Sequence, residues 1–307
     1  MLRPDGVFDP QLHLVGRGRD LLTTADAEAR LLSETTLHAT IAYFDGRTLT
    51  AIDADPAEPA LARLLGERTG SGFRARVDEE VPHQRDDESL LYQLLDDLTV
   101  AILISGYVLS TVPMSTPPAM AEAMRRNENV CAGWRSGGTI MEGVADDGRP
   151  PMVTGPELSP LLRDDDPLSW HELPTLPAHG MRRHRRVDIW PTGNGLVHVD
   201  SFFRDTHMSE DGTETAIHEY AVDADVDPRS EKFVSGAADP RVLPWVECPP
   251  AADSASRIAG MALADLRPAV RAEFTGTTTC THLNDQLRSL AGVRALLRQL
   301  PELERTT

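Results

Sequence analysis

Apolar and polar residues alternate along three stretches of the chain, the pattern expected of paired antiparallel strands. Residues 36–53 alternate around Asp45 and Gly46, a dipeptide typical of two-residue hairpin turns. Residues 185–205 alternate around a Thr-Gly-Asn-Gly turn at 192–195, and a further strand pair is expected at 216–237. The pattern therefore predicts antiparallel strands in both halves of the chain.

Apolar residues at helical spacing follow the strands in each half. They cover residues 88–109 in the first half, and 251–270 and 281–300 in the second. The most apolar run, 98–112, is shorter than the roughly 20 residues that span a membrane, so we expect a buried helix. The fold class is predicted to be α+β, with two related halves that each pack helices on an antiparallel sheet.

A proline-rich stretch separates the two halves. Seven prolines lie between residues 150 and 177, together with an acidic triplet at 164–166. Proline donates no backbone hydrogen bond and restricts the residue before it, so regular structure is not expected here. The predicted organisation is an N-terminal half at 1–147, a linker at 148–180 and a C-terminal domain at 181–307.

The two halves also show traces of an internal repeat. Asp20 and His38 precede Asp200 and His218 by the same 180 positions, without a gap. Nothing in the first half corresponds to Cys248 or Cys280. The hypothesis is that the N-terminal half is a degenerate copy and that the C-terminal half, the better-formed copy, carries the chemistry.

Charge and cysteine content narrow the class of protein. The net charge of −18 and the pI near 4.9 disfavour nucleic acid or an anionic membrane as a partner, because polyanions would be repelled. Three widely spaced cysteines do not suggest a disulfide framework, and no signal peptide is visible at the N-terminus. A cytoplasmic protein acting on a small molecule is expected, with no prediction for its oligomeric state.

The strongest chemical feature is the sequence GTTTCTHLND at 276–285, in which a single residue separates Cys280 from His282. If Cys248 ends a neighbouring strand, two thiolates and one imidazole would form a zinc or iron site, with Asp253, Asp285, His218 or water as the fourth ligand. The positive end of the following helix would favour thiolates. Packed, unreactive thiols and a metal-free Cys/His nucleophile remain alternatives.

Further site residues are expected on the strands of the C-terminal half. His218 and Asp200 are candidate acid–base or supporting groups. His184 and Arg185 belong to a basic cluster at 182–186, where they could anchor a phosphate or carboxylate of the substrate. The alternative for this cluster is pairing with the acidic triplet at 164–166.

The C-terminal half resembles a bacterial family of domains of unknown function with a Cys-Thr-His-Leu signature near its C-terminus. The residues that carry the resemblance are HRRVDIWPTG, VDSFFRDTH, AIHEYAVDADVDP, VECPPA and TTCTHLNDQL, within about 182–292. The layout of the last three segments is also similar to U-type iron–sulfur assembly scaffolds. However, no third cysteine lies between Cys248 and Cys280, and Pro249 stands where those scaffolds usually have glycine.

The hypothesis drawn from these features is a metal-dependent enzyme, of hydrolase type, in the catabolism of a small molecule. The family resemblance implies CoA-linked or aromatic compounds. Cys248, Cys280 and His282 would bind zinc or iron. The alternatives are a non-enzymatic metal or iron–sulfur carrier or scaffold, and a structural binding subunit with packed thiols. No dinucleotide-binding loop, phosphate-binding loop or serine-hydrolase elbow is present in the sequence.

Overall fold

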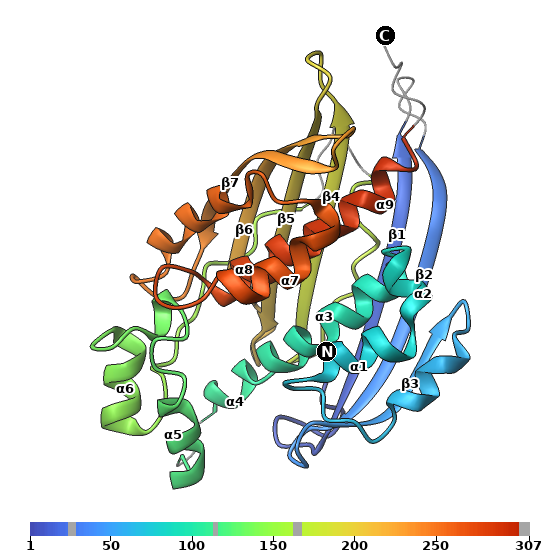
Figure 1. Ribbon diagram of the computed structural model, residues 1–307. Coiled ribbons are helices and arrows are strands. Elements are labelled where there is room, and N and C mark those ends of the chain that lie inside the picture. The colour runs from blue at the N-terminus through green and yellow to red at the C-terminus, as the bar shows by residue number, and fades with distance from the viewer. Residues whose placement is uncertain (24–28, 113–115, 162–167, 301–307) are drawn as a thin grey trace.

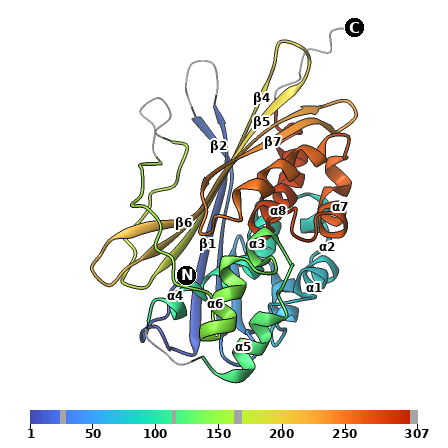
Figure 2. The ribbon, with the colours of Figure 1, turned by 90° about the vertical axis from the view of Figure 1, so that its left-hand side faces the viewer.

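The computed structural model describes residues 1–23, 29–112, 116–161 and 168–300. They form two antiparallel sheets whose main helices lie on the same side, so that one layer is sheet and the other helix (Figures 1 and 2). The first sheet has the order β1-β2-β3 and the second β4-β5-β6-β7. The strands are β1 (Gln11–Thr23), β2 (Ala29–Ala42), β3 (Thr48–Asp55), β4 (Met181–Pro191), β5 (Val197–Met208), β6 (Glu214–Asp227) and β7 (Lys232–Val242).

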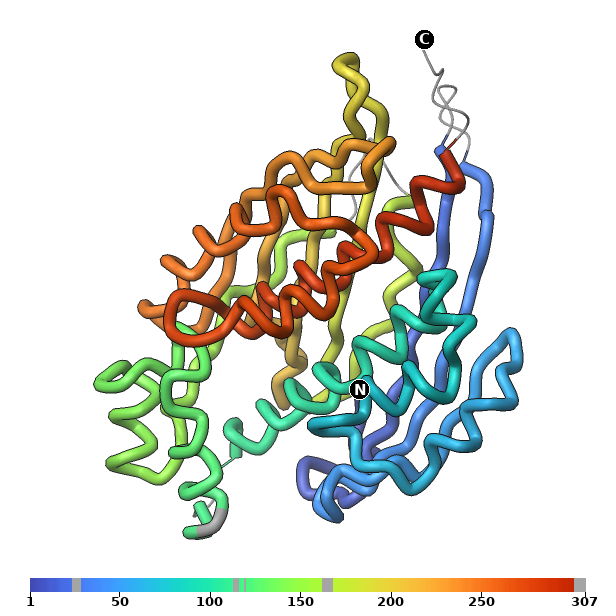
Figure 3. The backbone as a smooth tube through the Cα atoms, in the orientation of Figure 1, coloured from blue at the N-terminus to red at the C-terminus, as the bar shows by residue number. Residues whose placement is uncertain are grey.

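The helices follow the strands in each half, which confirms the predicted α+β fold with the larger sheet in the C-terminal half. The first half contains η1 (Pro59–Leu64), α1 (Phe73–Glu80), α2 (Pro82–Asp86), α3 (Leu90–Ile104), α4 (Tyr107–Ser110), α5 (Pro118–Arg125), η2 (Ala132–Trp134) and α6 (Thr139–Asp147). The second contains η3 (Pro249–Ile258), η4 (Leu263–Asp265), α7 (Leu266–Glu273), α8 (Thr281–Ser289), η5 (Leu290–Gly292) and α9 (Val293–Leu297). Figure 3 traces this path from the blue N-terminal half to the red C-terminal helices.

The three predicted strand pairs are present as β2–β3, β4–β5 and β6–β7. Strand β1 was not predicted. It contains Gly16 and Gly18, where a Cβ atom would lie only 3.2 Å from Leu94 and 3.4 Å from Leu90 of α3. These glycines let the helix approach the sheet closely, and they interrupt the alternation by which a strand is recognised.

The helical prediction for 251–270 needs a correction. The chain forms the 3-10 helix η3, turns at Gly260, which has φ of +85°, and starts the α-helix α7 only at Leu266. Two prolines at the start of η3 and the left-handed backbone at Gly260 prevent one continuous helix.

Each half has its own hydrophobic core. The first is formed by β1–β3 and α3, with Ile41, Leu49, Leu95 and Ile102 fully buried. The second lies between β5–β7 and helices η3, α7 and α8. It also contains Ala132 of η2, from the segment predicted to belong to the first half. The domain boundaries at 147 and 180 stay a prediction.

Helix α3 is the one place in the described residues where a membrane span could be considered. The stretch Leu90–Ser110 is long and apolar enough by length and composition, but the core helix of a soluble protein passes the same test. Leu91, Leu95 and Ile102 of this stretch pack into the first core. The stretch is therefore weak grounds for a membrane span.

The proline-rich stretch packs against the face of the second sheet opposite its helices (Figure 2). Trp170 contacts His184 and Phe202 of that face edge to face, with ring centroids 5.6 Å apart in both pairs. Arg204 of β5 donates a hydrogen bond to the backbone oxygen of Ser159. The stretch thus shields the outer face of β4 and β5. The acidic triplet at 164–166 lies outside the described residues.

The two halves share an antiparallel sheet with packed helices, but the aligned histidines differ in their settings. His38 is exposed and lies opposite Val15 of β1, whereas His218 is partly buried and lies opposite Asp205 of β5. The internal repeat stays a prediction.

Candidate metal centre

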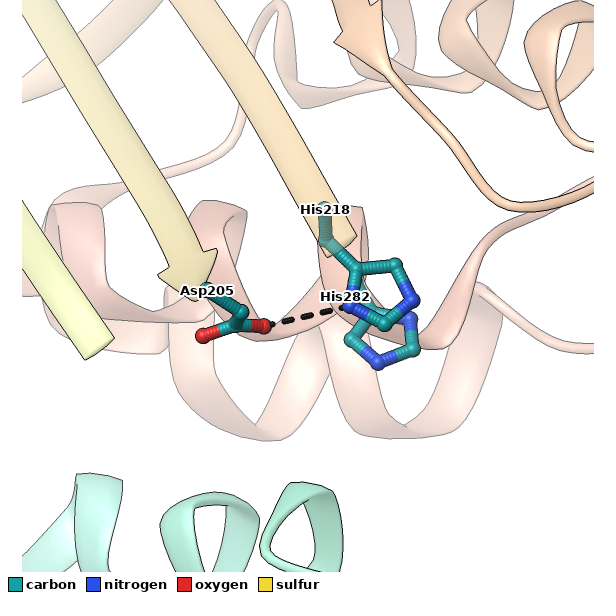
Figure 4. A group of neighbouring side chains, drawn as sticks. All are labelled: Asp205, His218 and His282. Carbon is teal, nitrogen blue, oxygen red and sulfur yellow. Dashed lines mark ion pairs between the residues drawn. The ribbon is translucent and has the colours of Figure 1, made fainter. Parts of the chain in front are cut away.

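Three potential metal ligands meet where β5 ends, β6 begins and α8 begins (Figure 4). Asp205 and His218 are direct partners in the β5–β6 register, so their side chains lie side by side on one face of the sheet. Helix α8 covers this face and brings in His282 from its first turn. One ligand atom from each of Asp205, His218 and His282 lies within 4.8 Å of the others.

The two imidazole rings are stacked, with centroids 3.7 Å apart and 23° between their planes. Nδ1 of His218 lies 3.3 Å from Oδ2 of Asp205, which is within ion-pair distance although the geometry is not that of a hydrogen bond. A metal ion lies in the plane of an imidazole that binds it, so at least one ring would rotate out of the stack to share an ion.

Asp205 is fully buried and is held by Arg183 of β4. The guanidinium forms a bidentate pair, with Nε 2.7 Å from Oδ1 and Nη2 2.9 Å from Oδ2. Burial acts to raise the pKa of Asp205, but Arg183 and then His218 outweigh it, and the pKa falls below its usual value. The carboxylate is therefore charged and fixed in direction, as a metal ligand must be.

His282 is held in its neutral form. Burial, followed by the neighbouring His218, places the pKa of His282 well below the usual value for histidine. Neutral imidazole is the form that binds metals. Because the His218 side chain keeps 12% of its surface exposed, the site is not sealed from solvent.

Behind the triad lies a buried network of arginines and carboxylates that joins the two halves. Asp285 of α8 pairs with Arg183, Arg185 and, from α1, Arg74, at N–O distances of 2.6, 3.0 and 2.7 Å. Burial acts to raise the pKa of Asp285, but Arg183, Arg185 and Arg74 outweigh it and lower the pKa.

A second carboxylate in this network comes from the first half. Asp96 of α3 accepts hydrogen bonds from Arg267 of α7 and Arg288 of α8, at 2.6 and 2.8 Å. Arg74 also contacts Asp96, at 2.8 Å. Each of these two buried carboxylates thus binds arginines of both halves.

The predicted thiol ligands lie beside this site but are not part of it. Cys248 and Cys280 are buried around the Tyr220 hydroxyl, and Cys131 joins them there. Among the described residues, the group of donors that meets ligand spacing contains neither thiol. Residues two positions apart at the start of a helix point in different directions. Cys280 accordingly faces Tyr220, and His282 faces Asp205.

The expectation that the helix start favours thiolates is wrong for these cysteines. Burial raises the pKa of Cys280, and the opposing effects of the Leu283 backbone and the neighbouring Tyr220 side chain do not outweigh it. Burial, together with Cys280 and Cys131, raises the pKa of Cys248 to about 12. The cost of desolvating a charged sulfur exceeds the effect of the helix end here, so both thiols are protonated at neutral pH.

The predicted substrate-binding and acid–base residues fall on opposite faces of the second sheet. Arg185 lies near the triad, but its guanidinium is bound by Asp97, Asp285 and Ser289. His184 is buried on the opposite face of the sheet, under Trp170. Asp200 lies on that opposite face too, where it pairs with Arg186 at 2.7 Å. Only His218 and His282 of the predicted residues enter the triad.

The fourth-ligand candidate Asp285 is bound by arginines, and Asp253 is exposed.

The buried His184 is expected to make the stability of the protein depend on pH. Burial, together with Arg182 and Arg204, lowers the pKa of His184 to about 4 from an ordinary 6.5. Below pH 6.5 the unfolded chain takes up a proton that the folded chain does not, so stability falls as the pH decreases toward 4. Between pH 7 and 5 this histidine is expected to contribute a loss of about 2 kcal/mol in unfolding free energy.

Replacing His184 by phenylalanine should remove that contribution. Urea unfolding at pH 7 and pH 5 should show a smaller loss for His184→Phe than for the unmodified protein. His38→Phe, at an exposed strand position, serves as the control. Equal losses in all three proteins would contradict the role of His184.

Asp205 was not predicted, and Arg183 was predicted only as a member of the basic cluster at 182–186, not as a partner of a metal ligand. A usable signal was the Asp-Gly dipeptide at 211–212, a hairpin turn between β5 and β6 in which Gly212 has φ of +87°. Counting back from this turn would bring residue 205 opposite residue 217. A bulge between Asp205 and Thr206 shifts the register by one residue and places Asp205 opposite His218.

The fold and the triad together define an α+β protein with a candidate metal centre in its C-terminal half. Residues 181–295 match the family model described as "Protein of unknown function (DUF2889)". The match runs from the start of β4 into α9 and contains the whole triad, and it confirms a resemblance to a family of domains of unknown function. No curated protein and no solved structure matches the chain. The Cys-Thr-His-Leu signature and the likeness to iron–sulfur scaffolds stay predictions.

Proposed function

We propose that Asp205, His218 and His282 bind one divalent transition-metal ion and that the protein is a metal-dependent enzyme of hydrolase type. The observation that carries this proposal is the convergence of one carboxylate and two imidazoles, with ligand atoms within 4.8 Å, from three separate elements. Perturbed, partly exposed titratable groups of this kind are typical of functional sites.

The ligand set favours zinc or iron. Two histidines and one carboxylate form catalytic zinc sites and the facial sites of non-haem iron enzymes. When bound by three protein ligands, such an ion leaves a position at which it can activate water. The predicted set of Cys248, Cys280 and His282 is less well supported, because burial keeps both thiols protonated.

The surrounding residues would prepare the ligands. Arg183 fixes both oxygens of Asp205, and Asp285 shares the charge of Arg183, so the arginine does not leave an unbalanced positive charge beside the ion. The partly exposed His218 lies on the side open to solvent. We extend the proposal to a small-molecule substrate, of the CoA-linked or aromatic kind that the family resemblance implied, and to a cytoplasmic location.

Metal equilibration tests the proposal. The purified chain is incubated with zinc or ferrous iron, freed of unbound metal and assayed for metal per chain. The expected result is one equivalent, together with hydrolysis of a test ester or thioester that chelation abolishes. A chain that retains no metal excludes the site. Retained metal without hydrolysis of any test substrate would favour a metal carrier, and a brown iron–sulfur chromophore a cluster scaffold.

A further inference from the structure

A separate cavity opens between the helices of the two halves. Its volume is about 380 Å³, within the size range of small-molecule sites. Helices α1–α3 form one wall, and η4, α7, α8 and α9 contribute the other. Six arginines line it: Arg74, Arg85, Arg267, Arg271, Arg288 and Arg294. This concentration of guanidinium groups occurs in a chain with a net charge of −18.

The acidic residues of the cavity wall are already engaged. Asp78 accepts a hydrogen bond from the Tyr92 hydroxyl at 2.6 Å, and Asp86 pairs with Arg85 at 2.7 Å. Glu88 pairs with Arg267 at 2.7 Å. These carboxylates are therefore held at the wall by neighbouring donors.

Donors remain on the α7 and α9 side of the cavity. Among the described residues, Arg271 has no ion-pair partner, and its side chain is exposed. Arg294 uses Nε for Glu231, at 2.9 Å, and its terminal nitrogens form no ion pair with any residue that the structure describes. Guanidinium groups with unused N–H donors bind carboxylate and phosphate oxygens in a bidentate manner.

We propose that this arginine-lined cavity binds a small molecule carrying clustered anionic oxygens, of phosphate or carboxylate type. Arg271 and Arg294 would contact the anion, while Arg74, Arg267 and Arg288, held by Asp96, form the positively charged floor. The occupant would touch both halves of the molecule. This site does not depend on the metal triad, because it is lined by other side chains.

Calorimetric titration with pyrophosphate and with succinate, without added metal, tests this inference on the full chain. Pyrophosphate or succinate should bind and raise the melting temperature, and salt should weaken binding. Arg271→Gln should weaken binding about tenfold, the effect expected for losing a charge-assisted hydrogen bond. Preferential binding of one probe assigns the occupant to phosphates or to carboxylates.

Two controls separate this site from general charge effects and from the metal centre. Arg126→Gln changes an arginine of equal charge that directly follows α5. Its side chain is 67% exposed and does not line the cavity, so affinity should be unchanged. His282→Ala should also keep the affinity. The inference is overturned if neither probe binds at millimolar concentration, or if Arg271→Gln and Arg126→Gln weaken binding equally.

Discussion

Replacing Asp285 by alanine is expected to lower the unfolding free energy by about 3–5 kcal/mol, the usual cost of removing one partner from a buried ion pair. Asp285 is 4% exposed and binds Arg74, Arg183 and Arg185. Its loss would leave three guanidinium groups in a buried region with one carboxylate fewer. Since domains are typically stable by about 5–15 kcal/mol, this single change would remove a large share of the total.

Urea unfolding, followed by tryptophan fluorescence and circular dichroism, measures this effect. Asp285→Asn retains the shape and part of the hydrogen bonding, so it should be destabilised less and remains informative if the alanine variant does not fold. Asp253→Asn, at an exposed carboxylate, should change stability by less than about 0.5 kcal/mol. If Asp285→Ala matched this control, the network would contribute nothing to folding.

The second large effect is expected at the metal triad. Replacing His282 by alanine should weaken zinc or iron binding by more than the 10–100-fold that loss of a supporting outer-shell residue typically costs. The reason is direct: only Asp205 and His218 would remain as protein ligands, and two ligands hold such ions poorly. Asp205→Asn should have a similar effect, because it removes the charge that Arg183 orients.

Metal per chain and competition with a chromophoric chelator report the affinity, and circular dichroism confirms that each variant is folded. His38→Ala provides the matched control, because His38 is an exposed strand histidine outside the triad. Cys280→Ala discriminates between the Asp205–His218–His282 site and the thiol-based site. It should leave metal binding at the Asp205–His218–His282 site intact, whereas a site that used the Cys280 thiol would lose its metal. Full metal retention by His282→Ala would contradict the assignment of Asp205, His218 and His282 as the metal ligands.

The strands were predictable where alternation is regular, and less so where packing requires another residue type. Hairpins around Asp45 and around 192–195 are encoded locally by turn residues. Strand β1 is not encoded locally in this way. Its Gly16 and Gly18 allow close contact with α3, a helix that begins more than 60 positions later in the sequence. That requirement becomes visible only when both elements are in place.

The candidate site was predictable in part for a similar reason. His282 and His218 stood out as histidines near helix and strand starts, but Asp205 acquires its meaning from the strand register. Proximity in sequence favoured Cys280 as the partner of His282, although the first turn of α8 directs the two side chains apart. The sequence could not indicate that burial would keep the thiols protonated.

Two sheets with separate cores would ordinarily be free to melt one after the other. Here Asp96 lies on α3 of one half and binds arginines of α7 and α8 in the other. If the junction opened while both cores were still folded, Asp96 and the arginines would lose their ion-pair partners. Charges that remained partly buried would then be unpaired, which is unfavourable. We therefore expect a single cooperative transition in calorimetry, with both halves of the molecule losing structure together.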